Sequence, residues 1–198
     1  MDKNELRKYI KAKIEENKAN LESESQIVCE KLLSDKAFLE APVLLAYMSL
    51  PDEVDVLPVI KEALKMGKKV AVPRVIEDSQ NRKMLFYYLK DDVDLAVQVE
   101  SGYYGISEPD VNNLQFSCEE TFESAFIIVP GRAFTKDGKR LGRGKGFYDV
   151  FLSQLINECK TAGKRICAAG VCFSCQLVDF IPADENDISV DKIVCAIP

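Results

Sequence analysis

The chain has 198 residues, of which 47% are hydrophobic and 29% charged, and its formal net charge is −6. This composition is typical of a globular protein of one domain, and an acidic chain lacks the broad basic face of a nucleic-acid binder. No run of about 18 apolar residues predicts a membrane span, and the charged N-terminal segment does not resemble a signal peptide. We therefore expect a cytoplasmic monomer that binds neither nucleic acid nor membranes.

Seven cysteines and no histidine restrict the chemistry further. An odd cysteine count in a chain without a secretion signal argues against a disulfide framework. Cys172 and Cys175 form a CxxC pair, but further zinc ligands are missing, and Cys172 follows an apolar run that is typical of a buried strand. We expect buried or inert thiols. The absence of histidine excludes Ser–His–Asp and Cys–His mechanisms.

The first half of the chain predicts alternating helices and strands. Asp2 followed by Glu5 resembles a capping box that opens a helix over residues 3–20. Gly67 is expected to end the helix before it, and Pro73 is expected to end the strand before it. The elements after the first helix are a helix near 23–34, a strand at 43–48, a helix at 54–66, a strand at 69–72 and a possible strand at 84–89.

The second half continues this alternation after a loop predicted at residues 101–110. The expected elements are a buried strand at 126–129, a helix at 147–161, and strands at 165–172 and 192–196. Strands that alternate with helices predict an α/β fold, with an open, largely parallel sheet flanked by helices in a single domain over 1–198. Ligands of such sheets bind beyond the carboxyl ends of the strands.

A glycine-rich segment follows the strand at 126–129, and residues 129–149 read VPGRAFTKDGKRLGRGKGFYD. It contains half of the ten glycines in the chain, interleaved with lysines and arginines. Glycines allow close approach of the backbone to a ligand, and exposed N–H groups beside cations form an anion site. The spacing fits neither a Walker A motif nor GxGxxG. The segment therefore predicts a phosphate site, and the alternative is a flexible surface loop with solubilising charges.

Further charged residues are candidates for the same site. Lys3 and Arg7 share one helix face, where an anionic ligand would offset their repulsion; the alternative is a solvated face. Asp149 follows the loop and, with Asp187, could hold Mg²⁺ beside a phosphate, although Asp149 could also only stabilise the helix start. Glu53 follows a predicted strand and is either a cap-region acid or a ligand contact.

The segment RLGRGKGFYD at residues 140–149 resembles the signature of the 5-formyltetrahydrofolate cyclo-ligase family, also called methenyltetrahydrofolate synthetases. Weaker blocks occur in the same order as in that family, at residues 3–7, 47–53, 72–74, 105–109 and 186–191. The resemblance implies an ATP- and Mg²⁺-dependent ligase that converts 5-formyltetrahydrofolate to 5,10-methenyltetrahydrofolate. The residues alone leave two alternatives open: a non-catalytic nucleotide- or folate-binding protein, and a small kinase with another acceptor.

The resemblance also implies a role for individual positions. ATP contacts are implied for Lys3, Arg7, Arg140, Leu141, Gly142, Arg143, Gly144, Lys145, Gly146, Phe147 and Tyr148. Folate contacts are implied for Met48, Glu53, Gly144, Lys145, Gly146 and Phe147, and magnesium ligation for Asp149 and Asp187. Arg143 and Lys145 are the expected catalytic residues, and Arg74 is a further candidate for an anion contact. Phe147 stands where the family usually has tyrosine, so a hydroxyl contact is lost there.

Overall fold

The computed structural model describes residues 1–77, 82–91, 93–102, 105–182 and 184–197. A six-stranded sheet forms its centre, in the order β10-β9-β6-β1-β2-β3. The strands are β1 (Val43–Leu45), β2 (Lys69–Glu77), β3 (Arg82–Tyr88), β6 (Ser124–Val129), β9 (Arg165–Cys172) and β10 (Lys192–Cys195). Only the β2–β3 pairing of this sheet is antiparallel. The predicted α/β fold with a largely parallel sheet is thus confirmed.

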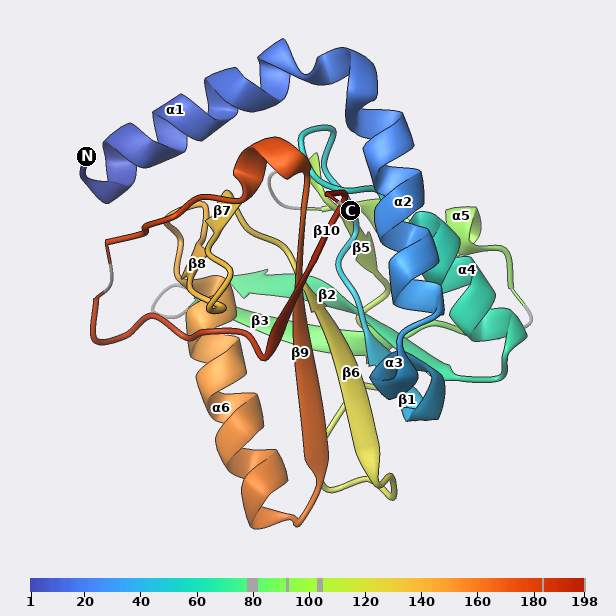
Figure 1. Cartoon of the computed structure of the whole chain (residues 1–198). Coiled ribbons are helices and arrows are strands. Elements are labelled where there is room, and N and C mark those ends of the chain that lie inside the picture. The colour runs from blue at the N-terminus through green and yellow to red at the C-terminus, as the bar shows by residue number, and fades with distance from the viewer. Residues whose placement is uncertain (78–81, 92, 103–104, 183, 198) are drawn as a thin grey trace.

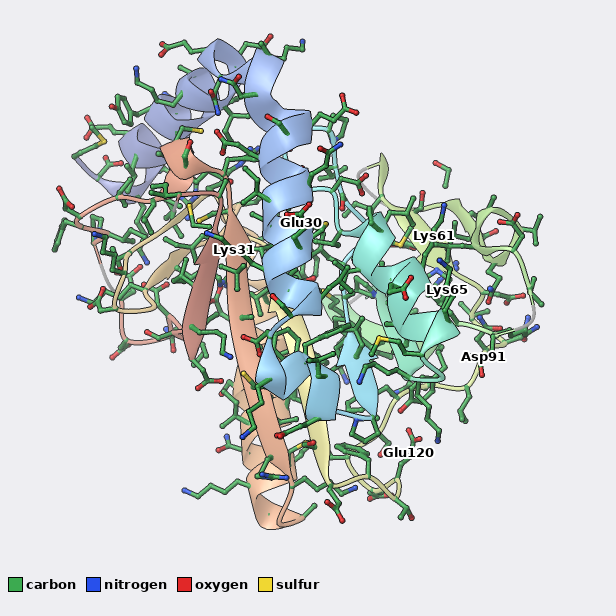
Figure 2. All side chains as sticks on the ribbon, turned by 45° about the vertical axis from the view of Figure 1, so that its right-hand side comes forward. Glu30, Lys31, Lys61, Lys65, Asp91 and Glu120 are labelled. Atoms are coloured by element: carbon green, nitrogen blue, oxygen red, sulfur yellow. A yellow bond between two sulfur atoms is a disulfide. The ribbon has the colours of Figure 1, made fainter. Side chains whose placement is uncertain are left out.

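Helices cover both faces of the sheet (Figure 1). One face carries α2 (Leu21–Leu33), α3 (Lys36–Glu40) and α4 (Leu57–Lys65), and the other carries α6 (Phe147–Thr161). Successive side chains of β6 point to opposite faces of the sheet and enter the two hydrophobic cores. Phe126 packs edge-on against Phe38 of α3, and Ile127 lies in the core under α6. On the solvent side of α4, Lys61 and Lys65 are exposed (Figure 2).

The order of the strands places a switch point between β1 and β6. Leu45 of β1 pairs with Ala71 of β2 on one side and with Ile127 of β6 on the other. The chain passes from β1 through α4 to β2 in one direction, and from β6 through α6 to β9 in the other. Connections that diverge in this way leave a crevice at the carboxyl ends of the two strands, where ligands of α/β sheets bind.

The N-terminal helix α1 (Lys3–Glu16) begins with the predicted capping box. The Asp2 carboxylate accepts a hydrogen bond from the Glu5 N–H at 2.9 Å, and the Asp2 N–H donates to Glu5 Oε2 at 2.8 Å. The helix ends earlier than expected and continues as a 3₁₀ turn, η1 (Lys18–Asn20). Its buried residues Leu6, Ile10 and Ile14 pack on Ala133 and Leu141 of the glycine-rich segment and on Ile181 of the C-terminal part.

The remaining predicted elements form close to the expected boundaries, except at Pro73. The strand β2 continues through Pro73 and pairs it with Phe86 of β3. This is possible because β1 ends at Leu45, opposite Ala71, so no neighbouring strand needs an N–H from residue 73. Two residues further on, the Val75 N–H donates to the Glu108 side chain instead of to a strand.

The region predicted as a loop at residues 101–110 also contains regular structure. A short helix α5 (Leu95–Gln98) leads into β4 (Val99–Ser101), which pairs antiparallel with β5 (Ser107–Pro109). The loop prediction was therefore wrong for β5 and for Ser101, the last residue of β4. The intervening Tyr103 and Tyr104 lie outside the described residues.

The glycine-rich segment is not one continuous loop. Its first part folds back as an antiparallel hairpin of β7 (Ala133–Phe134) and β8 (Arg140–Leu141). The expectation of a direct passage from β6 into a single loop was wrong, because the Phe134 and Ala133 side chains are apolar and become buried. Only residues 142–146 form an open loop before α6.

The cysteines follow the expectation of buried, inert thiols only in part. Cys118 and Cys159 form a disulfide that joins the segment before β6 to the end of α6, so the expectation of free thiols was wrong for this pair. Cys172 ends β9 and is fully buried, as predicted. The described residues contain no group of three or more metal-ligating side chains, and none of their helices is long and apolar enough to cross a membrane.

Candidate functional site

A cavity of about 270 Å³ opens at the carboxyl ends of β1 and β6, at the switch point. Its walls come from the turn after β1, from residues 130–131 after β6 and from the start of α6. It brings together most of the residues expected from the sequence: Met48, Glu53, Arg140, Gly142, Arg143, Lys145, Gly146, Phe147, Tyr148 and Asp149. The sheet topology thus gathers residues that are about 100 positions apart in the chain.

The open loop at residues 142–146 depends on glycine conformation. Gly144 has φ +90° and Gly146 has φ +74°, a left-handed region that side chains with a Cβ disfavour. Gly146 is the N-cap of α6 and provides no side-chain acceptor to the first N–H groups of the helix. The positive end of the helix dipole and these N–H groups therefore face the loop, which suits a phosphate.

Arg143 connects the loop to the acidic turn after β1. Its Nε donates to Glu53 Oε1 at 2.8 Å, and its Nη2 pairs with Asp52 Oδ1. The other Asp52 oxygen pairs with Arg132. Burial alone would raise the pKa of Asp52, but the hydrogen bonds from Arg143 and Arg132 outweigh it and hold this pKa below its ordinary value. The cluster is therefore charged and compact.

Arg140 lies below the loop with only 3% of its side chain exposed. Its Nη2 contacts Asp149 Oδ1 at 2.6 Å, and its Nη1 donates to the Pro130 carbonyl at 3.3 Å. Two buried polar atoms of this wall, Arg140 Nε and Tyr148 Oη, have no hydrogen-bond partner among the described residues. Buried polar groups usually have partners, so these two atoms are available to a polar ligand at the cavity.

The candidate residues of α1, Lys3 and Arg7, do not line the cavity. Lys3 pairs with Asp184 and Asp187, both at 2.6 Å. Burial would lower the pKa of Lys3, but the two carboxylates raise it above its ordinary value. Arg7 Nε donates to the Gly142 carbonyl at 2.8 Å. The helix α1 is thus fastened to both the loop and the acidic C-terminal segment.

Leu141, Gly144 and Asp187 also lie outside the lining of the cavity. Leu141 is 1% exposed and packs under α1, so its side chain supports the loop from below. Asp187 approaches the start of α6 through its neighbour, since the Ile188 N–H lies 3.5 Å from Asp149 Oδ1. The two candidate magnesium ligands therefore belong to adjoining segments, and each is paired with a cation.

Three charged residues of the site region were not expected as site residues from the sequence: Asp52, Arg132 and Glu108. Asp52 directly precedes Glu53 in the acidic turn, and Arg132 belongs to the glycine-rich segment, so their neighbours were the only available signal. Glu108 lines the cavity although it is only 1% exposed. Arg74 does not line the cavity; it pairs with Glu100 at 2.8 Å, and its Nε lies 3.9 Å from Glu108 Oε2.

A second hollow of about 660 Å³ lies between α2 and the turn after β1 and shares Leu50 and Glu53 with the first. Its charged lining residues are the acids Glu22, Glu53 and Asp55. An acidic hollow repels phosphate, so the smaller cavity with the cationic loop is the better anion site.

The fold and the site together define an α/β protein with a cationic, glycine-rich loop at the switch point of its sheet. Residues 1–196 match the family model of the 5-formyltetrahydrofolate cyclo-ligase family. The "Probable 5-formyltetrahydrofolate cyclo-ligase" of Caenorhabditis elegans is 30% identical over 194 residues, which cover 97% of this chain and 91% of the relative. The chain belongs to the 5-formyltetrahydrofolate cyclo-ligase family, and it is an enzyme of the ligase class.

Solved structures give the same result. The 5,10-methenyltetrahydrofolate synthetase of Aquifex aeolicus is 31% identical and superposes with a TM-score of 0.74, covering 99% of this chain and 90% of its own. The 5,10-methenyltetrahydrofolate synthetase of Mycoplasma pneumoniae, at 24% identity and a TM-score of 0.68, covers 98% of both chains and supports the fold.

Proposed function

We propose that the protein converts 5-formyltetrahydrofolate to 5,10-methenyltetrahydrofolate and uses ATP, which becomes ADP and phosphate. The observation that carries this proposal is one cavity in which the cationic loop faces the turn that holds Met48 and Glu53. Because the two sets of residues expected to contact ATP and folate share this cavity, a phosphoryl group and a formyl oxygen can meet there.

The chemistry requires activation of an amide-like oxygen, which is a poor leaving group. The formyl oxygen attacks the γ-phosphorus of ATP, and the bond from that phosphorus to the bridging oxygen breaks to release ADP. Nitrogen 10 then attacks the formyl carbon and loses its proton, and phosphate leaves with the former formyl oxygen. Arg143 and Lys145 would stabilise the charge on the phosphoryl group, since transfer of this kind depends mainly on positioning and electrostatics.

The size of the cavity indicates which parts of the substrates it encloses. A volume of about 270 Å³ lies near the lower end of small-molecule sites, so two large substrates cannot both be enclosed. We infer that only the triphosphate end and the pterin ring enter. The adenosine and glutamyl parts would lie along the surface, where Lys3 and Arg7 of α1 flank the loop.

The folate side of the cavity has polar groups that a ligand can satisfy. Glu53 and Met48 would border the pterin, together with Phe147 at the start of α6. The unpartnered Tyr148 Oη and Arg140 Nε would gain hydrogen-bond partners from bound substrate or from water that it traps. These available polar atoms favour substrate binding in this cavity over binding in the acidic hollow beside it.

The residues present fit a magnesium ion bound jointly with ATP. Mg²⁺ prefers one or two carboxylates together with phosphate oxygens and water, and Asp149 and Asp187 supply two carboxylates from adjoining segments. When bound, the ion would neutralise charge on the phosphates. Asp149 and Asp187 would then exchange contacts with Arg140 and Lys3 for the ion, which leaves those cations to the phosphates.

The test is an assay of the purified protein with MgATP and 5-formyltetrahydrofolate, in which the ultraviolet absorbance of the methenyl product is followed. We expect product in many-fold excess over enzyme. Folded protein that forms none would overturn the proposal. ATP hydrolysis measured with and without the folate separates the alternatives, because a kinase with another acceptor ignores the folate and a non-catalytic binder hydrolyses nothing.

We propose further that the whole chain acts as one monomeric cyclo-ligase domain in the cytoplasm, as its composition suggests. Size-exclusion chromatography with light scattering would give a mass near 22.2 kDa for a monomer. A mass twice as large would exclude the monomer.

A further inference from the structure

We infer that Asp52 and Arg132 are positioning residues that hold Arg143 at the boundary between the nucleotide loop and the folate side of the cavity. This inference rests on the proposed function of Arg143 in phosphoryl transfer. Neither Asp52 nor Arg132 lines the cavity, so they would act through Arg143 and not on the substrates.

The open loop needs a support outside itself. Residues 143–146 are exposed, and Gly144 and Gly146 take left-handed conformations that a glycine leaves easily. Arg7 holds the carbonyl of Gly142 at one end, and α6 begins at the other. A long arginine side chain on such a loop loses much rotational freedom when it is placed for reaction, so a fixed contact that pre-positions it lowers this cost.

Arg132 is built on a rigid base. Its N–H donates to the Leu141 carbonyl at 2.6 Å, and its carbonyl accepts from Gln176 Nε2 at 3.2 Å. Gln176 is 1% exposed and also donates to the Gly131 carbonyl at 2.9 Å. The backbone of Arg132 is therefore held from two sides, and its side chain is only 13% exposed.

Asp52 transfers this rigidity to the loop, because its two oxygens are divided between two arginines. Asp52 Oδ2 pairs with Arg132 Nη1, and Oδ1 pairs with Arg143 Nη2. The side chain of Asp52 is 31% exposed and that of Arg132 13%, so water screens this bridge less than a surface pair. Nη1 of Arg143 makes no hydrogen bond with the described residues, so it can reach a phosphate while Arg143 stays anchored.

Asp52 also determines how strongly Arg143 engages Glu53. With Asp52 present, the guanidinium of Arg143 is shared between two carboxylates. Without it, Glu53 alone would retain Arg143, and the guanidinium would shift further toward the carboxylate that borders the pterin. We therefore expect loss of Asp52 to disturb both sides of the reaction.

The first test is a set of variants of the full chain: Asp52→Asn, Arg132→Met, Arg143→Ala and the double variant of Asp52→Asn with Arg143→Ala. Each of the first two should lower kcat/KM for ATP about tenfold, since small misplacements of a reacting group have large effects. The matched control is Asp137→Asn, an exposed acid that pairs with Lys139 at 3.5 Å and should leave kcat/KM unchanged. In the Arg143→Ala background, Asp52→Asn should have no further effect.

An equal loss of kcat/KM from Asp52→Asn with and without Arg143 would overturn the inference, because Asp52 would then act independently. So would a fall in melting temperature that accounts for the loss of activity.

The second test does not depend on catalysis. Hydrogen exchange of residues 143–146, measured in the ligand-free protein, should be about tenfold faster in Asp52→Asn and in Arg132→Met, and unchanged in Asp137→Asn. Unchanged exchange in the first two variants would overturn the positioning role even if the protein is an active cyclo-ligase. Faster exchange in a protein that makes no methenyl product would leave the positioning role standing and overturn the proposed function instead.

Discussion

Arg140 lies just before the open loop and Arg143 lies within it, and the two side chains occupy different environments. The Arg140 side chain is 3% exposed and bound to Asp149 and to a backbone carbonyl, whereas that of Arg143 is 33% exposed and bound to the acidic turn after β1. Removal of one partner of a buried ion pair destabilises the fold strongly, because the remaining charge is buried without compensation. A partly exposed cation such as Arg143 is screened more by water and has a smaller effect on stability, and its N–H groups that make no ion pair remain available to a ligand.

The two sides of this segment therefore differ in role: one stabilises the fold, and the other carries the residues expected to act in the reaction. The side with Arg140 continues into the β7–β8 hairpin and the packing of Leu141 under α1. The side with Arg143 continues into Lys145 and the start of α6. Substitutions on the first side should therefore act mainly on stability, and substitutions on the second side mainly on turnover.

The largest effect on activity is expected for Lys145→Ala. Loss of one cation that stabilises developing charge should lower kcat about 100- to 1000-fold, with little change in melting temperature. Steady-state kinetics and a thermal melt measure the two quantities. The control is Lys136→Ala, an exposed lysine of the same segment outside the cavity lining. A fall in melting temperature large enough to explain the loss of turnover in Lys145→Ala would assign a structural role to Lys145.

The largest effect on stability is expected for Arg140→Met. The apolar side chain keeps much of the volume but leaves Asp149 without its cation, so the free energy of unfolding should fall by about 3 kcal/mol. Urea denaturation measures it. Arg143→Met is the matched variant and should cost less than about 1 kcal/mol. Equal stability losses in the two variants would contradict the comparison.

A smaller effect is expected for Asp149→Asn, which tests the magnesium proposal. Asparagine keeps an oxygen that can accept from Arg140 but loses the charge that the metal requires. The Mg²⁺ concentration for half-maximal activity should rise at least about tenfold, in line with losses at other metal sites. A titration of activity with Mg²⁺ measures it, and an unchanged midpoint would remove Asp149 from the metal site.

The smallest effect concerns pH. The Asp187 pKa is lowered: burial would raise it, but the Asp184 N–H and Lys3 outweigh this. Its contribution to stability is therefore fully present above the ordinary aspartate pKa of 3.8 and is lost as the pH falls through the lower folded-state value. Asp187→Asn should lower the unfolding free energy at pH 7 by less than about 1 kcal/mol, and this difference should vanish near pH 2. A difference that grows as the pH falls below 3.8 would contradict this sign.

Local signals in the chain predicted much of the fold because they act between neighbours. The capping box of Asp2 and Glu5 formed as expected, and α6 and β9 have the predicted boundaries. The signals failed where a distant segment decided the outcome. Pro73 stays within β2 because β1 is short, and β5 lies within the predicted loop at 101–110, where it pairs with β4.

By itself the sequence determined the alternation of helices and strands, the loop with its glycines and cations, and the resemblance to the family that the comparisons confirm. Composition and short-range spacing carry this information, because helix caps and glycine conformations depend on adjacent residues. The tertiary structure decided which cation is buried and which is exposed, and it joined Arg143 to Asp52 across 91 positions. Such pairings arise from the order of the strands, since β1 and β6 deliver their following turns to the same edge of the sheet.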